Sequence, residues 1–100
     1  MSGVDMIAAE RQRQIDVEGY TAEHDDEHHP EDLMAAGHAY LSWAQEQVSG
    51  DDPVRAFGEL PGWWPWRARD WKPSDDPIRN MVKGCALHAA AIDRLQRKRK

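Results

Sequence analysis

The stretch PEDLMAAGHAYLSWAQEQV, from Pro30 to Val48, decides the expected fold. Pro30 is favoured in the first turn of a helix, and Glu31 and Asp32 follow where the helix dipole favours negative charge. Apolar residues then recur every three or four positions, which predicts an amphipathic helix. They are Leu33, Gly37, Tyr40, Leu41, Ala44 and Val48. Gly37 lies within this stripe, so a second helix can approach closely there.

Similar patterns on either side predict two more helices. The first runs from Asp5 to Val17, and the last begins with Asp76 as cap and Pro77 in its first turn and continues to about Arg97. The expected apolar stripes are Val4, Ile7, Ala8, Arg11 and Ile15 in the first helix and Ile78, Met81, Val82, Cys85, Ala89, Ile92 and Leu95 in the last. The sequence therefore predicts an all-α fold, a small three-helix domain over residues 1–100.

A long connection separates the second and third of these helices. It contains a series of helix breakers, namely Pro53, Gly58, Pro61, Gly62, Pro65 and Pro73. A connection of this length is unusual in a small domain, so we expect it to pack against the helices rather than extend into solvent. The connection is rich in tryptophan, and we expect it to lie between the second and third helices.

Length and composition indicate a soluble protein of the cytoplasm. The 100 residues suit one domain, and Cys85 is the only cysteine, so no disulfide forms within the chain. The N-terminus lacks the apolar run of a signal peptide. No stretch approaches the roughly 20 apolar residues that a membrane helix needs, so we expect no membrane association.

The net charge of −5 is distributed unevenly along the chain. Residues 14–62 contain 12 acidic residues and one basic residue, Arg55, whereas residues 63–100 contain ten basic and four acidic residues. Such a division predicts an acidic face and a basic face on the folded protein, and surface charge steers association with partners.

The stretch TAEHDDEHHPED, residues 21–32, allows more than one interpretation. It contains ligand types suited to a divalent metal, namely His24, Asp25, Asp26, His28 and Glu31. A metal-dependent hydrolase or nucleotide-binding protein using this turn is one hypothesis. Such chemistry needs further ligands converging from separate helices, and the other helices supply few. We therefore expect no catalytic residue, no bound metal and no cofactor.

Arg11 supports a structural interpretation of the same stretch. It falls on the apolar stripe of the first helix, where an isolated charge is costly. The acidic turn follows closely, so Arg11 can fold back onto Asp25 or Asp26 and fix the turn against the helix. Thr21 can cap a short helical turn there. A carboxylate beside an arginine is a poor general acid, which favours the structural role over catalysis.

The stretch PGWWPWRARDWKP, residues 61–73, places tryptophans among basic residues. The rings of Trp63, Trp64, Trp66 and Trp71 could stack on bases of single-stranded nucleic acid or anchor a protein interface. A small helical domain also needs such rings for its core, and tryptophan is highly buried on average. We expect most of these rings in the core. Direct nucleic-acid binding through this loop stays a further alternative.

Several motifs together resemble a widespread family of small phage and prophage proteins. They are ERQRQIDVEGYTAEHDD, WWPW, WKP and IRNMVKGCALHAAAIDRL, and the resemblance covers about Ile7 to Arg97. Small acidic phage proteins of this kind are often inhibitors of host defence, and this one is similar to an anti-CRISPR protein. The resemblance implies a non-enzymatic protein of the host cytoplasm. The implied partner is a host protein or ribonucleoprotein complex, specifically a CRISPR effector.

An acidic surface fits this implied role, because it can occupy lysine and arginine clusters that a nucleic-acid-binding complex keeps for phosphates. A protein acting in this way needs no cofactor and does not itself bind nucleic acid. The expected partner-binding residues are Glu23, Asp26, Glu27, Glu31, Asp32, Trp64, Trp66, Arg67, Arg69 and Lys72.

Overall fold

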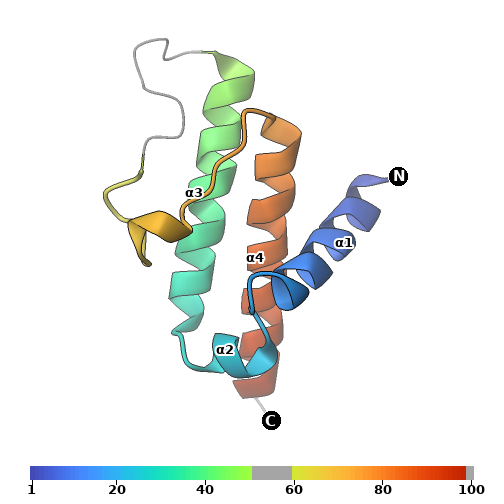
Figure 1. The fold of residues 1–100 in the computed structure, drawn as a ribbon, viewed down its shortest axis with the longest axis vertical. Coiled ribbons are helices and arrows are strands. Elements are labelled where there is room, and N and C mark those ends of the chain that lie inside the picture. The colour runs from blue at the N-terminus through green and yellow to red at the C-terminus, as the bar shows by residue number, and fades with distance from the viewer. Residues whose placement is uncertain (51–59, 99–100) are drawn as a thin grey trace.

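The computed structural model describes residues 1–50 and 60–98, and these segments are helical with no strand (Figure 1). The helices are α1 (Gly3–Asp16), α2 (Ala22–Asp26), α3 (Pro30–Ser49) and α4 (Pro77–Lys98), with a short 3-10 turn at Ala68–Asp70. The prediction of an all-α fold is confirmed. The predicted helical turn in the acidic stretch is α2, and the hydroxyl of Thr21 accepts a hydrogen bond from the backbone N–H of His24.

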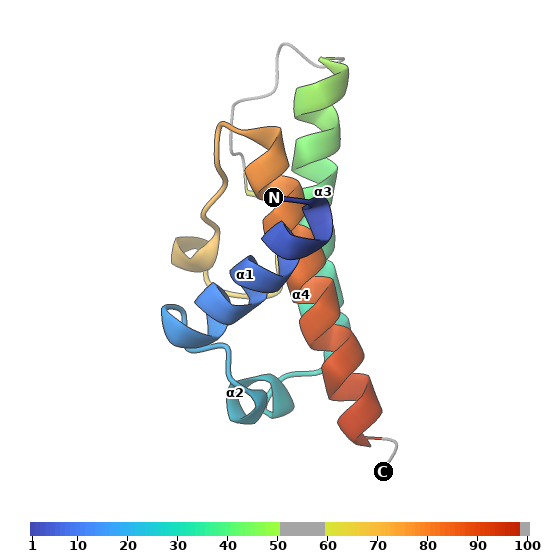
Figure 2. The same ribbon diagram turned by 90° about the vertical axis from the view of Figure 1, so that its right-hand side faces the viewer.

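Two long helices, α3 and α4, run antiparallel and side by side (Figures 1 and 2). The other helix of substantial length, α1, crosses α4, while α2 lies at the end of the pair where α3 begins. Figure 2 shows α2 and the described part of the tryptophan-rich loop on one side of the pair. On the opposite side, no element of residues 1–50 and 60–98 covers the two helices.

The core lies between the α3/α4 pair and the loop. Its buried members are Leu33, Ala36, Ala39, Tyr40, Trp43, Trp71, Leu87, Ala90 and Ala91, with Tyr20, Trp64 and Trp66 packed against them. The predictions that the loop packs and that most of its rings belong to the core are therefore confirmed for the described residues, although Trp63 is 49% exposed. Pro53 and Gly58, two of the expected helix breakers, lie outside these residues.

The predicted apolar stripe of α3 is largely confirmed. Leu33, Gly37, Tyr40 and Ala44 are buried and Leu41 is half-buried, whereas Val48 is exposed near the end of the helix. The close approach expected at Gly37 is also present. A Cβ atom at Gly37 would lie 2.9 Å from the carbonyl oxygen of Gly84 on α4. The residues of this stripe therefore form the face of α3 that packs against α4.

The predicted stripe of α1 is confirmed only in part. Ile7, Arg11 and Ile15 are half-buried, whereas Val4 and Ala8 are exposed and the fully buried side chains of α1 are the polar Glu10 and Gln14. The physical reason is that this face of α1 meets basic side chains of α4 and the loop rather than an apolar surface. Glu10 then gains charged hydrogen-bond partners, which offset the cost of burying a carboxylate.

The predicted stripe of α4 is wrong for most of its members. Of its members only Val82 is buried, and the buried face is instead made by Asn80, Val82, Gly84, Ala86, Leu87, Ala90 and Ala91. Small side chains on this face let the backbone of α4 approach α3 closely. The larger apolar residues of α4 consequently point away from the core, and Ile78, Met81, Ile92 and Leu95 are exposed.

Candidate partner-binding site

The acidic turn is fixed to α1 by a buried ion pair. Asp25 is completely buried, and Nη2 of Arg11 lies 3.0 Å from its Oδ2. Nη1 of Arg11 donates a second hydrogen bond to the backbone carbonyl oxygen of Tyr20, at 3.0 Å. The predicted pairing of Arg11 is confirmed, with Asp25 rather than Asp26 as the partner. These contacts hold α2 in a defined position beside α1.

The two histidines of the turn take part in a cluster of rings. His24 Nδ1 lies 3.1 Å from Oδ1 of Asp25, and His24 Nε2 lies 3.2 Å from Nε2 of His28. The ring of Tyr20 stacks on His24, and the ring of Trp66 lies against His28 with 5.6 Å between centroids. Within the described part of the chain, no group of three or more His, Cys, Asp or Glu side chains is placed to hold a metal ion.

Asp26 connects α2 to the end of α4. Its Oδ1 accepts a hydrogen bond from Nη2 of Arg97 at 2.8 Å and lies 3.5 Å from Nε of Arg94. Asp26, one of the expected partner-binding residues, therefore already pairs with arginines of α4, and its side chain is 47% exposed. The other expected acidic residues remain at the same end of the molecule, where Glu23, Glu27 and Glu31 are exposed and Asp32 is half-buried.

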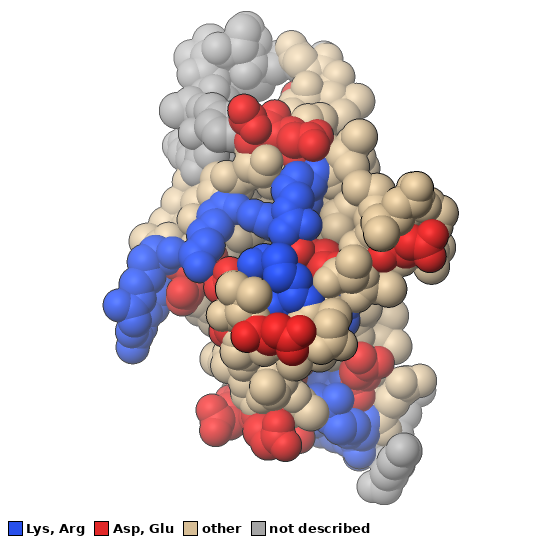
Figure 3. All heavy atoms as spheres, turned by 45° about the vertical axis from the view of Figure 1, so that its right-hand side comes forward, with Lys and Arg blue, Asp and Glu red and all other residues tan. Residues whose placement is uncertain are grey.

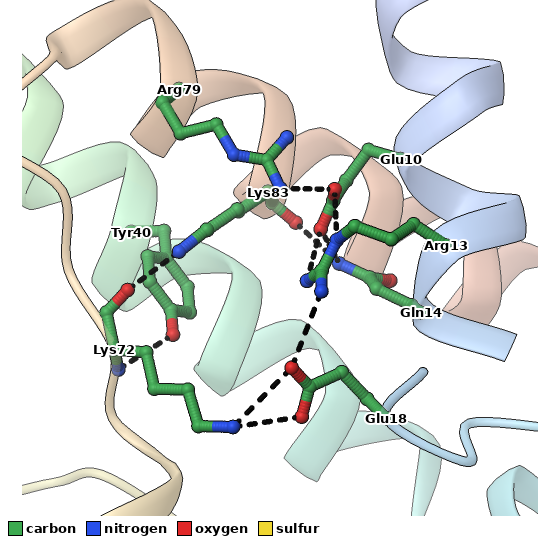
Figure 4. A network of polar contacts seen from close by, with 8 residues as sticks. All are labelled: Glu10, Arg13, Gln14, Glu18, Tyr40, Lys72, Arg79 and Lys83. Carbon is green, nitrogen blue, oxygen red and sulfur yellow. Dashed lines mark hydrogen bonds and ion pairs between the residues drawn. The ribbon is translucent and has the colours of Figure 1, made fainter. Parts of the chain in front are cut away.

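A polar network lies where α1, α4 and the loop meet (Figure 4). At its centre is Glu10, which is only 2% exposed. Its carboxylate accepts hydrogen bonds from Nε of Arg13, at 2.8 Å, and from Nη2 of Arg79. Burial by itself raises the pKa of Glu10, but the hydrogen bonds and charges of Arg13 and Arg79 outweigh it and hold the pKa below its usual value.

Glu18 extends this network to the loop. Its Oε2 accepts a hydrogen bond from Nζ of Lys72 at 3.0 Å, and its Oε1 lies 3.4 Å from Nη1 of Arg13. The bond from Lys72 is the main cause that lowers the pKa of Glu18. The backbone N–H of Lys72 also donates to the hydroxyl of Tyr40, and burial raises the pKa of Tyr40 to about 12.

The prediction of a separate acidic face and basic face is wrong. Figure 3 shows basic atoms in a band across one face of the molecule, with acidic atoms above, below and among them. Acidic residues of the segment 14–62 pair with basic residues of the segment 63–100, as Glu18 does with Lys72 and Asp26 with Arg97. The two oppositely charged segments thus fold against each other and partly neutralise one another.

The ring cluster lines a cavity of about 310 Å³ on the surface beside α2. The lining residues are Glu18, Tyr20, His24, His28, Trp66, Arg67 and Asp70. Aromatic rings thus alternate with side chains of both charge signs. Sequence reasoning missed Glu18, Tyr20 and Asp70, although the nearness of Tyr20 to the histidines in the chain is a signal that could have found it.

The structure brings only some of the expected partner-binding residues together. Trp66 and Arg67 lie beside the acidic turn, because Trp66 contacts His28 and both line the same cavity. Arg67 and Arg69 are exposed, and the carbonyl oxygen of Arg67 accepts a hydrogen bond from Nε1 of Trp64. Lys72 instead belongs to the polar network around Glu18.

Comparisons of the sequence with protein-family models, with curated proteins and with solved structures gave no match. None of the helices in the described part of the chain is long and apolar enough to cross a membrane.

Proposed function

We propose that this protein is a non-enzymatic interaction protein that inhibits a host nucleic-acid-handling defence complex by occupying a basic surface of that complex. The observation that carries the proposal is the group of exposed carboxylates, Glu23, Glu27 and Glu31, at the end of the molecule where α2 and α3 begin. The resemblance to small phage proteins of the anti-CRISPR kind points to a CRISPR effector as the complex and to the host cytoplasm as its location.

The anchoring of α2 supports this role. Its one buried carboxylate, Asp25, is held by Arg11, and Asp26 is held by Arg97. The exposed carboxylates are therefore displayed on a turn that is fixed at both ends. A fixed array of negative charges loses little conformational entropy when it binds a cluster of lysines and arginines.

The tryptophan-rich loop supplies the second part of the proposed contact. Trp66 and Arg67 reach the cavity beside α2, and Arg69 is exposed next to it in the chain. Arginine and tryptophan contribute strongly to the free energy of protein–protein binding when they lie within an interface. The carboxylates then steer association through long-range attraction, while the loop provides short-range contacts.

The test begins with capture of the partner from a bacterial lysate by the tagged protein and its identification by mass spectrometry. Association and dissociation rates are then measured for the double variant Glu23→Lys with Glu27→Lys. We expect a lower association rate with little change in dissociation, and a steeper loss of binding as salt concentration rises in the parent than in the variant.

The matched control is Asp75→Lys, compared with Glu23→Lys alone so that the two changes in net charge are equal. Asp75 is exposed and follows Ser74, which contacts Gln47 near the end of α3, whereas α2 lies at the beginning of α3. The proposal predicts that this control binds and inhibits nearly as well as the parent. Equal binding by the Glu23 and Glu27 variant would show that the acidic turn is not the contact. Loss of activity on chelation of divalent metals would instead favour a metal-dependent hydrolase.

A further inference from the structure

The α3/α4 pair has one side that no described element covers, and this side is apolar. Its members on α4 are Ile78, Met81, Cys85, His88, Ile92 and Leu95, and its members on α3 are Met34, His38, Leu41, Gln45 and Val48. Two of them lie at its edges, because Ile78 also lines a cavity with Met6 of α1 and the ring of His38 lies 5.4 Å from that of Trp63. Ile92 is 57% exposed, Ile78 52% and Val48 68%, although such side chains are ordinarily buried. We call these residues the bare face.

The bare face contains no Asp, Glu, Lys or Arg among the described residues of the two helices. Two charged side chains of α4 are held away from the bare face, since Arg79 reaches Glu10 and Arg97 reaches Asp26. The bare face also includes two histidines, and burial together with the nearby His38 lowers the pKa of His88, so His88 is neutral near pH 7. An uncharged surface of this kind fits neither phosphate groups nor a charged peptide, and it fits another apolar surface.

The residues of the bare face have the spacing of a helix–helix seam. On α4 they alternate in steps of three and four positions from Ile78 to Leu95, and on α3 they do so from Met34 to Val48. Steps of three and four produce knobs-into-holes packing between helices. The seam between the two helices is closed by Leu41 and His88, each of which approaches the glycine of the opposite helix. The result is a flat two-helix layer.

The stripe of α4 is also complementary to itself when reversed. In an antiparallel pair of α4 helices, Ile78 can face Leu95 of a second copy, Met81 can face Ile92, and Cys85 can face His88. The two ends of α4 carry opposite charges, because exposed Asp75 and Asp76 precede the helix and exposed Lys98 ends it. Antiparallel packing brings Lys98 of one copy close to Asp75 and Asp76 of the other, where opposite charges attract.

The area is sufficient for a dimer. Two helices of about 20 residues form a layer about 30 Å long and about 20 Å wide, given 1.5 Å of rise per residue and an axial separation of about 10 Å. Pairing of two such layers buries on the order of 1,200 Å² in total, which reaches the lower end of the range for specific protein–protein interfaces.

We propose that the bare face binds a second copy of this chain, so that two α3/α4 layers form a four-helix bundle with α4 antiparallel to α4. The two-fold axis passes between Cys85 and His88 of the two copies. Such a dimer presents two acidic turns at opposite ends. The proposal of a dimer does not depend on whether these turns bind the partner proposed above.

The oligomeric state tests this proposal. Sedimentation and light scattering over a wide range of concentration should show a dimer for the parent chain. Ile92→Glu buries a charge between the two α4 helices of the proposed dimer and should raise the dimer dissociation constant by about a hundredfold or more. Met81→Glu should act alike, because Met81 faces Ile92. The control is Val4→Glu, since Val4 is 77% exposed on α1, outside the bare face.

The helical circular dichroism spectrum and the melting temperature identify any variant that fails to fold. If one of the variants Ile92→Glu and Met81→Glu does not fold, the dimer dissociation constant of the other tests the proposal. A parent chain that is monomeric throughout would overturn the proposal, as would folded Ile92→Glu and Met81→Glu variants that dimerise as strongly as the parent.

Disulfide trapping tests the arrangement of the helices. The variant I78C/L95C is made in a C85S background, so that its two cysteines lie about 25 Å apart on one helix and cannot pair within a chain. Mild oxidation should cross-link two chains of the double variant and should not cross-link I78C/C85S or L95C/C85S. Cross-linking of the single variants without that of the double variant would overturn the antiparallel pairing of α4 with α4.

Discussion

Gly84 on α4 lies against Gly37 on α3, and a Cβ atom added at Gly84 would lie 2.7 Å from the carbonyl oxygen of Gly37. The two helices thus touch backbone to backbone at this point. Their approach places Leu33, Ala36 and Leu87 in the completely buried part of the structure and turns the larger apolar side chains of α4 outward. One contact between two glycines therefore decides both the core and the bare face.

Gly84→Ala should lower the free energy of unfolding by about 1–2 kcal/mol. Alanine favours a helix over glycine by up to about 1 kcal/mol, but a Cβ 2.7 Å from backbone forces α3 and α4 apart, and overpacking costs about 1–3 kcal/mol. Urea denaturation measures the change. Gly3→Ala is the control, since its Cβ would meet nothing within 4 Å. A stabilised Gly84→Ala variant would contradict the close approach.

Arg11→Ala should lower the free energy of unfolding by about 3–5 kcal/mol, because it leaves the completely buried carboxylate of Asp25 without its cation. It also removes the hydrogen bond to the carbonyl oxygen of Tyr20. The control is Arg69→Ala, an exposed arginine whose replacement should change stability by no more than about 0.5 kcal/mol. Equal effects of the two substitutions in chemical denaturation would show that the pair does not hold α2.

Glu10→Gln should change how stability depends on pH. The folded-state pKa of Glu10 lies below its usual value of 4.5, so the ionised carboxylate stabilises the fold above pH 4.5, and this contribution is lost as pH falls through the lowered pKa. The variant lacks the contribution at every pH. Urea denaturation from neutral pH downward should therefore show a difference between parent and variant that is largest near pH 7 and shrinks below pH 4.5. A constant difference would contradict this assignment.

Trp71→Ala and Trp63→Ala should separate a core ring from a surface ring of the same loop. Trp71 is 9% exposed and its ring centroid lies 4.7 Å from that of Tyr40, so truncation should cost about 3–5 kcal/mol of stability. Trp63 is 49% exposed, and its truncation should cost much less. Thermal unfolding measures both. Similar losses for the two variants would show that Trp63 contributes to the core as well.

The limits of the helices follow closely from local sequence signals. Pro30 and Pro77 begin α3 and α4, and Gly50 ends α3 with a left-handed backbone conformation at φ 64°. The pairing of Arg11 with the acidic turn was also predictable, because the two are only 14 residues apart and a charge on an apolar stripe needs a nearby partner. These features depend on residues that are close in the chain.

The sequence did not identify the buried face of α4, and the physical reason is a competition between two possible faces. Hydrophobicity favours the stripe of Ile78, Met81, Ile92 and Leu95, whereas close packing favours the small residues Gly84, Ala86 and Ala91. The second face is buried, because small residues allow the backbone contact with Gly37. Pattern reasoning weighs hydrophobicity alone and so selects the wrong face.

Some features of the candidate site were likewise predictable from the sequence, whereas others depend on the tertiary structure. The sequence by itself determined an all-α chain, its helix limits and the anchored acidic turn, because each depends on residues close in the chain. It also indicated that the tryptophan-rich loop packs, because large aromatic rings favour burial. Only the tertiary structure decided that Glu18 pairs with Lys72 and Asp26 with Arg97, 54 and 71 residues apart, and that Glu10 is buried. Charge attraction acts through space, so the partners that it selects depend on how the helices pack.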